Sequence, residues 1–336
     1  MNRVLAWTSA GIAIGLALLA PLFLESHHIH ILIQILLFAY VSYCWNILGG
    51  FAGQLSFGHA LFMAVGAYTS TLLLLELGIS PWLGMIAGGL LAALLGLFIG
   101  FLSFRYGIKG TYFALVTLAF TEIGRIVALN TESIGGALGL YIPIKSTDFM
   151  QLKFVDKSHY YYVMLGFLSL AMAVTAWLGR SATGHRLVAI RENEDAAQAL
   201  GINLLRYKLF ATALSAFLTA MGGTLYAHYV TFIDPNTLLN MGMALEITIY
   251  AIVGGVGTLL GPLVGAIFLV PLAEVIRASL GQSYAGIHLV AYGAVLMGVI
   301  LFAPEGLVGL ASKLKAKWFG AKRRSLSPRA EKVAAK

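Results

Sequence analysis

This 336-residue sequence has few charged residues and a single cysteine. Asp, Glu, Lys and Arg make up 11% of the chain, against about 25% in a typical soluble protein, and 59% of the residues are hydrophobic. So few charges could not cover the surface of a water-soluble protein. The single cysteine, Cys44, excludes a disulfide framework within the chain. The composition therefore indicates a membrane protein.

The sequence also lacks the motifs of several enzyme classes. It contains no G-x-x-x-x-G-K-[ST] phosphate-binding loop, no H-E-x-x-H and no G-x-S-x-G. The histidine-rich stretch 27–30 comes without a set of carboxylates or cysteines, and is more typical of a membrane interface than of a metal site. We therefore expect neither catalytic residues nor a metal site.

Long apolar runs fill most of the chain. A transmembrane helix needs about 20 apolar residues, and we predict ten spans. They lie at about 4–24, 30–49, 56–77, 82–103, 110–129, 159–179, 208–230, 242–257, 259–279 and 284–304. The first is read as a retained anchor rather than a signal peptide, and the eighth is short and merges into the ninth. The predicted fold is an all-α polytopic membrane protein.

The positions of Lys and Arg set the orientation, because cytoplasmic loops carry an excess of them. With the N-terminus inside, 17 of the 22 bases fall in inside segments. We predict cytoplasmic termini and a transmembrane domain over 1–310, with an outside loop at 130–158 and a cytoplasmic loop at 180–207. The polybasic tail 311–336 is expected to lie in the cytoplasm and contact membrane lipid rather than nucleic acid.

A short, charged and alanine-rich helix over 194–200 is predicted in the cytoplasmic loop. Its signals are a cap at Asn193, acids at Glu194 and Asp195, helix formers at Ala196 and Ala197, and a terminating Gly201. A helix this short is marginal alone, so we expect it to dock on another surface through its small alanine face. A solvated connector helix is the alternative.

Several blocks of the sequence resemble a family of membrane subunits from ABC importers. Asp195-Ala196-Ala197, then Gly201 after three residues, is similar to the E-A-A-x-x-x-G signature, with Asp for Glu and without the downstream Ile-x-Leu-Pro. In that family this loop is a coupling helix that docks on the ATPase. The stretches 46–70, 179–203, 252–266 and 304–309 resemble the LivM-type branched-chain amino acid permeases.

The resemblance, which covers about residues 30–310, implies a permease subunit of an ATP-driven importer for leucine, isoleucine and valine in the bacterial cytoplasmic (inner) membrane. Its expected partners are a second homologous permease subunit, two ATP-binding cassette subunits and an external solute-binding protein. ATP would be used by those partner chains, and this chain would bind no cofactor. A urea or short-amide permease of the same superfamily and an ion-coupled secondary transporter remain alternatives.

Glycines and polar residues crowd the junction of the second and third spans. They are Asn46, Gly49, Gly50, Gly53, Gln54, Ser56 and His59. Glycines allow close helix packing or a broken helix, so both simple packing and an inner gate on the translocation path explain them.

Glu246, in the eighth span with no base within a turn, is a candidate path residue or interhelical contact. Glu122–Arg125 and Glu274–Arg277 are read as structural ion pairs near the outer interface.

Overall fold

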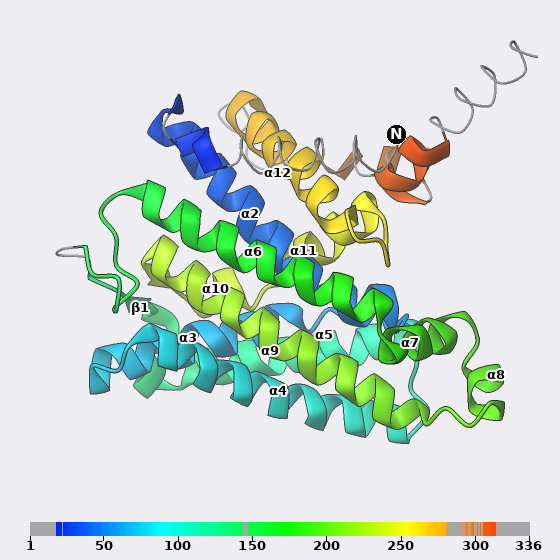
Figure 1. The fold of residues 1–336 in the computed structure, drawn as a ribbon. Coiled ribbons are helices and arrows are strands. Elements are labelled where there is room, and N and C mark those ends of the chain that lie inside the picture. Colours follow the sequence, from blue (N-terminus) through cyan, green and yellow to red (C-terminus); the bar gives the residue numbers. More distant parts are fainter. Residues whose placement is uncertain are drawn as a thin grey trace, which may run out of the picture.

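The computed structural model describes residues 18–21, 23–143, 147–280 and 305–313, with a few positions between 290 and 303. The long helices are α2 (Ser26–Asn46), α3 (His59–Leu77), α4 (Pro81–Arg105), α5 (Thr111–Asn130), α6 (Lys157–Arg180), α9 (Leu204–Val230), α11 (Met241–Gly254) and α12 (Gly261–Leu280). The short elements are η1 (Ile47–Phe51), η2 (Glu132–Ile134), η3 (Gly136–Leu138), β1 (Leu140–Tyr141), α7 (Ala182–Glu192), α8 (Glu194–Ala199), β2 (Phe232–Ile233) and α10 (Pro235–Leu238). The antiparallel strands β1 and β2 pair over only two residues each, so the fold is all-α (Figure 1).

Among the described residues, eight helices are long and apolar enough to cross a membrane. They correspond to the second to ninth predicted spans, whereas most of the predicted spans 4–24 and 284–304 and most of the tail 311–336 lie outside the described residues. The short eighth span is completed by α10, which extends α11 to a 20-residue segment, Pro235–Gly254. A glycine-rich turn separates it from α12.

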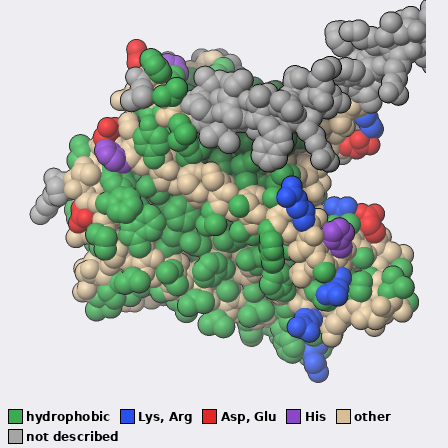
Figure 2. Space-filling model, in the orientation of Figure 1, with side chains coloured by type: hydrophobic (Ala, Val, Ile, Leu, Met, Phe, Trp, Pro, Cys, Tyr) green, Lys and Arg blue, Asp and Glu red, His purple; other side chains and the backbone are tan. Residues whose placement is uncertain are grey.

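The two long loops lie at opposite ends of the helices (Figure 1). β1 belongs to the loop 130–158, and α7 and α8 belong to the loop 180–207. Figure 2 shows a broad hydrophobic band on one face of the molecule, with Lys and Arg side chains gathered at the end that carries α7 and α8. We keep the predicted orientation and refer to that end as the cytoplasmic side.

Side-chain caps begin several of these helices. Asp156, Asn193, Asn203 and Asn240 each accept a hydrogen bond from a backbone N–H in the first turn of α6, α8, α9 and α11. These bonds satisfy donors that have no partner within the helix. The caps thus fix where the helices begin on both sides of the membrane.

α3, α4 and α9 pack together, and α2 packs against α6, α9, α11 and α12. A Cβ at Gly66 would lie 1.9 Å from the carbonyl oxygen of Ala220, and one at Gly223 would lie 1.8 Å from that of Met63. Only glycine therefore allows α3 and α9 to approach this closely. α2 is the most enclosed span, with 78% of its apolar window buried, against 28% for α5 and α6.

Candidate functional site

α2 does not lead directly into α3. After Asn46 the chain forms the π-helical turn η1, continues as an irregular segment over 52–58, and enters α3 at His59. Gly53 has a φ of +68°, a conformation that glycine adopts readily but that interrupts a helix. The sequence predicted that the third span begins at 56, so α3 begins three residues later than predicted. The glycine cluster thus marks a broken connection as well as close packing.

Side chains from neighbouring helices satisfy the backbone of this irregular segment. The indole N–H of Trp45 donates to the carbonyl of Ser56 at 2.8 Å. The N–H of Phe57 donates to the hydroxyl of Thr117 at 3.0 Å, and the hydroxyl of Thr121 donates to the carbonyl of Phe57 at 3.3 Å. Irregular backbone within a membrane domain requires such partners, because buried polar groups are costly when unpaired. The break is therefore held by side chains of both α2 and α5.

Asn46 connects the end of α2 to the turn between α11 and α12. Its carbonyl oxygen accepts from the N–H of Gly257 at 2.8 Å, and its amide donates to the carbonyl of Thr258 at 3.2 Å. A Cβ at Gly50 would lie 2.0 Å from the Asn46 side-chain oxygen and 2.7 Å from the Gly257 nitrogen. Gly50 is therefore needed for the two segments to meet.

The helix α8 is attached to the same place. Arg191 donates to the carbonyl of Gly50 at 2.8 Å. One oxygen of Glu194 accepts from Lys208 at 2.6 Å and from the Gln54 amide at 3.3 Å. Lys208 is 4% exposed, so this ion pair is largely shielded from water. We call the assembly of η1, the segment 52–58, the turn 255–258 and these contacts of Arg191 and Glu194 the inner junction.

The predicted short helix is confirmed as α8, which ends one residue earlier than predicted. The Asn193 side chain accepts from the N–H of Ala196 at 3.0 Å, and Gly201 has a φ of +80°. The expectation that Ala197 offers a surface for docking is wrong, because Ala197 is only 2% exposed and packs within the chain. The exposed residues are Asp195, Ala196, Gln198, Ala199 and Leu200.

His59 lies fully buried at the start of α3. The hydroxyl of Ser215 donates to the carbonyl of Cys44 at 2.7 Å, so its oxygen accepts from Nε2 of His59, also at 2.7 Å. Nδ1 of His59 is then an acceptor, and it has no partner among the described residues. Gly49 lies against Trp45, because a Cβ at this position would be 2.4 Å from the Trp45 ring. His59 thus ties α3 to α9 and α2 rather than facing the cytoplasm.

Glu246 lies apart from the inner junction. It is half-buried on α11, about 12 Å from Gly254 at 1.5 Å per residue, and none of the hydrogen bonds among the described residues involves it. Sequence reasoning missed Arg191 and Lys208, although a lysine at the start of an apolar span was a visible signal.

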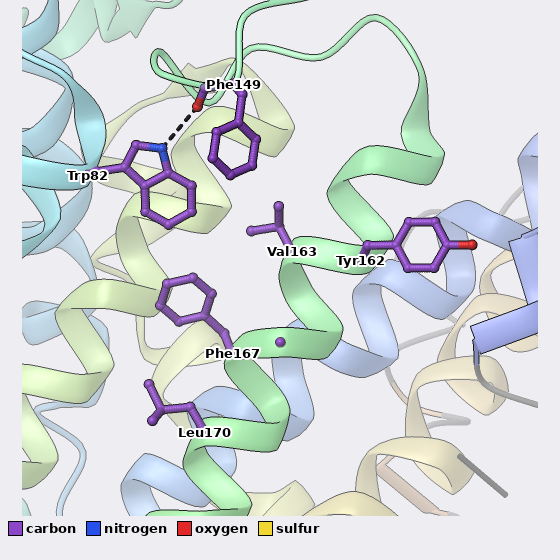
Figure 3. Close-up of a pocket in the computed structure, with 7 residues that line it drawn as sticks. Trp82, Phe149, Tyr162, Val163, Phe167 and Leu170 are labelled. Carbon is purple, nitrogen blue, oxygen red and sulfur yellow. Dashed lines mark hydrogen bonds between the residues drawn. The ribbon is translucent and has the colours of Figure 1, made fainter. Parts of the chain in front are cut away.

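An apolar cavity of about 400 Å³ lies near the outer end of α4 and α6 (Figure 3). The Trp82 indole N–H donates to the carbonyl of Phe149 at 2.9 Å, and the hydroxyl of Tyr162 points away from the other labelled residues (Figure 3). The remaining walls come from Val163, Gly166, Phe167 and Leu170. These walls suit hydrocarbon rather than a charged solute.

Comparison with known proteins places the chain in a family. Residues 28–304 match the family described as branched-chain amino acid transport system / permease component. The chain is 31% identical to the high-affinity branched-chain amino acid transport system permease protein LivM of Escherichia coli, covering 81% of this chain and 68% of the relative. It is 25% identical to a probable LivM of Methanocaldococcus jannaschii, over 81% of this chain and 90% of the relative.

A more distant likeness is to the autoinducer 2 import system permease protein LsrC of Klebsiella pneumoniae, 34% identical over 33% of this chain and 34% of the relative. No solved structure matches the chain. The family match spans the inner junction, α8 and all eight described spans except the first two residues of α2. The chain therefore belongs to the branched-chain amino acid transport system permease family, as a multi-pass membrane subunit of ABC transporters.

Proposed function

We propose that this chain forms part of the translocation path of an ATP-driven importer for leucine, isoleucine and valine in the bacterial inner membrane. A second permease subunit would complete the path, two ATP-binding cassette subunits would use ATP, and an external solute-binding protein would deliver the amino acid. In this proposal the chain performs no chemistry. It changes which side of the membrane the path opens to.

The attachment of α8 to the inner junction is the observation that carries this proposal. Arg191 and Glu194 hold the ends of the α7–α8 turn against Gly50, Gln54 and Lys208. A force applied to α8 would therefore reach the break between α2 and α3 and, through Asn46, the turn between α11 and α12. Such a connection would let an ATPase open or close the cytoplasmic end of the path.

The surface around α8 supports a docking role. Its exposed side carries Ala196 and Ala199 beside Leu200, which is 80% exposed. A polar groove of about 290 Å³ runs along the N-terminal end of α8 and contains Lys109. An exposed leucine among small side chains, next to a polar groove, is a surface suited to a protein partner.

Replacement of Ala196 tests the docking. In the assembled transporter, Ala196→Arg should place an unpaired guanidinium in a closed contact and weaken ATPase association by about a hundredfold or more. Because Ala196 is exposed and Arg is a good helix former, the isolated chain should fold as before. Co-purification of the ATPase and amino acid uptake in proteoliposomes are the measurements.

Ala182→Arg, at an exposed position of α7 in the same loop, is the matched control. It should leave both ATPase binding and uptake close to those of the wild type. If Ala196→Arg also binds the ATPase normally and supports uptake, α8 is a solvated connector and the proposed coupling fails. Competition of leucine uptake by isoleucine, valine and urea separates the proposed substrates from the short-amide alternative.

A further inference from the structure

The pair Glu122–Arg125 lies in the outer half of α5. At 1.5 Å per residue, Glu122 is about 16 Å from the cytoplasmic end at Thr111 and about 12 Å from the outer end at Asn130. The hydrocarbon core of a bilayer is about 30 Å thick. Glu122 therefore lies within the span, in its outer half, and the bond from Arg125 to Asn236, the second residue of the segment Pro235–Gly254, places the pair toward the outer end.

The two side chains form an ion pair, yet both remain partly exposed. The closest contact joins Nη2 of Arg125 to Oε1 of Glu122 at 2.5 Å, and Nη1 of Arg125 donates to the side-chain oxygen of Asn236 at 2.9 Å. The Arg125 and Glu122 side chains are 28% and 51% exposed. Ionisable residues at membrane depth almost always face the bundle interior or a water-filled cavity. An exposed ion pair therefore argues against lipid as the neighbour of this face of α5.

The other peripheral helices show what a lipid-facing surface looks like here. α6 is buried to the same extent as α5, yet has no Asp, Glu, Lys or Arg between its terminal residues Lys157 and Arg180. α4 has no such residue before its last, Arg105. Exposure thus coincides with an uncharged surface on α4 and α6, whereas α5 and α12 carry the exposed pairs Glu122–Arg125 and Glu274–Arg277.

The exposed face of α5 is also hollowed along its length. One groove of about 500 Å³, at the cytoplasmic end, is lined by Lys109, Tyr112 and Leu115. A second, of about 350 Å³, is lined by Leu115, Ala119, Glu122 and residues from the α10–α11 region. Both grooves include Leu115, so they lie next to one another on the exposed face of α5, and the second reaches Glu122.

We propose that this face of α5 lines the translocation path and that Glu122 and Arg125 bind the charged end of an α-amino acid. The substrate carboxylate would take the guanidinium edge that Glu122 now occupies, and its ammonium group would pair with the Glu122 carboxylate. Asn236 would hold Arg125 in place meanwhile. The aliphatic side chain of the substrate would rest against the apolar groove wall, which includes Leu118, Leu239 and Met241. This inference rests on the proposed function and names the substrate contacts.

The first test is uptake of leucine by the complete transporter in proteoliposomes. Glu122→Gln and Arg125→Gln should each lower uptake about tenfold or more, because each loses a charge-assisted contact with the substrate. The matched control is the second pair, Glu274 and Arg277 on α12, which has the same spacing. Glu274→Gln and Arg277→Gln should leave uptake within about twofold of the wild type. ATPase co-purification checks that every variant assembles.

The second test does not depend on the substrate. Cys44 is the single cysteine of this sequence and is buried, so an introduced cysteine is labelled without background from this chain. Ala119→Cys should react with a membrane-impermeant, charged thiosulfonate reagent, and leucine should slow the reaction. Leu94→Cys, 62% exposed on the uncharged helix α4, should not react.

The outcomes separate this inference from the proposed function. A wild-type complex that imports no leucine refutes the proposed function before any variant is made. If the wild type imports leucine but both Gln variants do so equally well, the role of the ion pair is overturned. If Ala119→Cys does not react, the proposal that this face of α5 is open to water is overturned, whatever the uptake results.

Discussion

Two ion pairs of nearly equal length are held in very different surroundings. Lys208 and Glu194, 2.6 Å apart, have side chains only 5% and 19% exposed within the inner junction. Arg125 and Glu122, 2.5 Å apart, have side chains 28% and 51% exposed on α5. The first pair joins the cytoplasmic loop to α9, whereas the second joins two residues of one helix turn and reaches Asn236.

The difference indicates what each pair is for. A buried pair is destabilising to break, since removing one partner leaves an uncompensated charge. An exposed pair is screened by water and contributes little to folding. The pair Lys208–Glu194 therefore serves to hold α8 in its position against α9. For Glu122–Arg125, stability gives little reason to keep two charges within a span, and the proposed substrate contact supplies one.

The largest effect is expected from Lys208→Met, which leaves the Glu194 carboxylate without its cation. Breaking a buried pair costs about 3–5 kcal/mol, and the lower end applies here because Glu194 keeps some exposure. The expected result is a strongly lowered thermal midpoint in detergent. The loss of ATPase binding should accompany it, since α8 is no longer held.

The double variant Lys208→Met/Glu194→Gln checks this explanation. With both charges gone, no uncompensated charge remains, so the thermal midpoint should recover most of the loss. Recovery of stability without recovery of ATPase coupling would show that the pair positions α8. If Lys208→Met alone unfolds no earlier than the wild type, the inner junction is not held by this pair.

A smaller effect is expected from Gly50→Ala. The added methyl group would lie 2.0 Å from the Asn46 side-chain oxygen and 2.7 Å from the Gly257 nitrogen, so the α2 end and the turn must move apart. Overpacking of this kind costs about 1–3 kcal/mol. Gly166→Ala, where nothing lies within 4 Å of the new Cβ, is the control and should be neutral or stabilising. Thermal unfolding in detergent measures both.

Much of the fold was predictable from local patterns. Apolar length located the eight described spans, and the Asn193 cap with Gly201 located α8, because these signals act within one helix. The partners of Asn46 and Gly50 were not predictable, since they lie more than 200 residues away at Gly257 and Thr258. Spacing within one helix revealed Glu122–Arg125, but only the assembled helices show that this pair stays exposed.

The inward position of Ala197 could not be predicted for the same reason. An alanine-rich helix of six residues has small side chains on several sides, so its sequence does not tell which side packs on the chain. The contacts of Glu194 with Lys208 and Gln54 decide this by fixing the rotation of α8. Composition thus identified the helix, and long-range polar contacts determined its exposed face.

The smallest effect on stability is expected at the exposed pair. Glu122→Gln/Arg125→Gln should unfold at a midpoint indistinguishable from that of the wild type, because water and salt already screen the two charges. The thermal midpoints of the two single variants and the double variant should be additive, whereas those of the Lys208–Glu194 set should be strongly non-additive. Measuring both cycles in the same detergent and salt makes the comparison direct. A large coupling at Glu122–Arg125 would mean that the assembled protein buries the pair as a structural bridge. Additivity in stability combined with loss of leucine uptake would instead assign the two charges to the substrate.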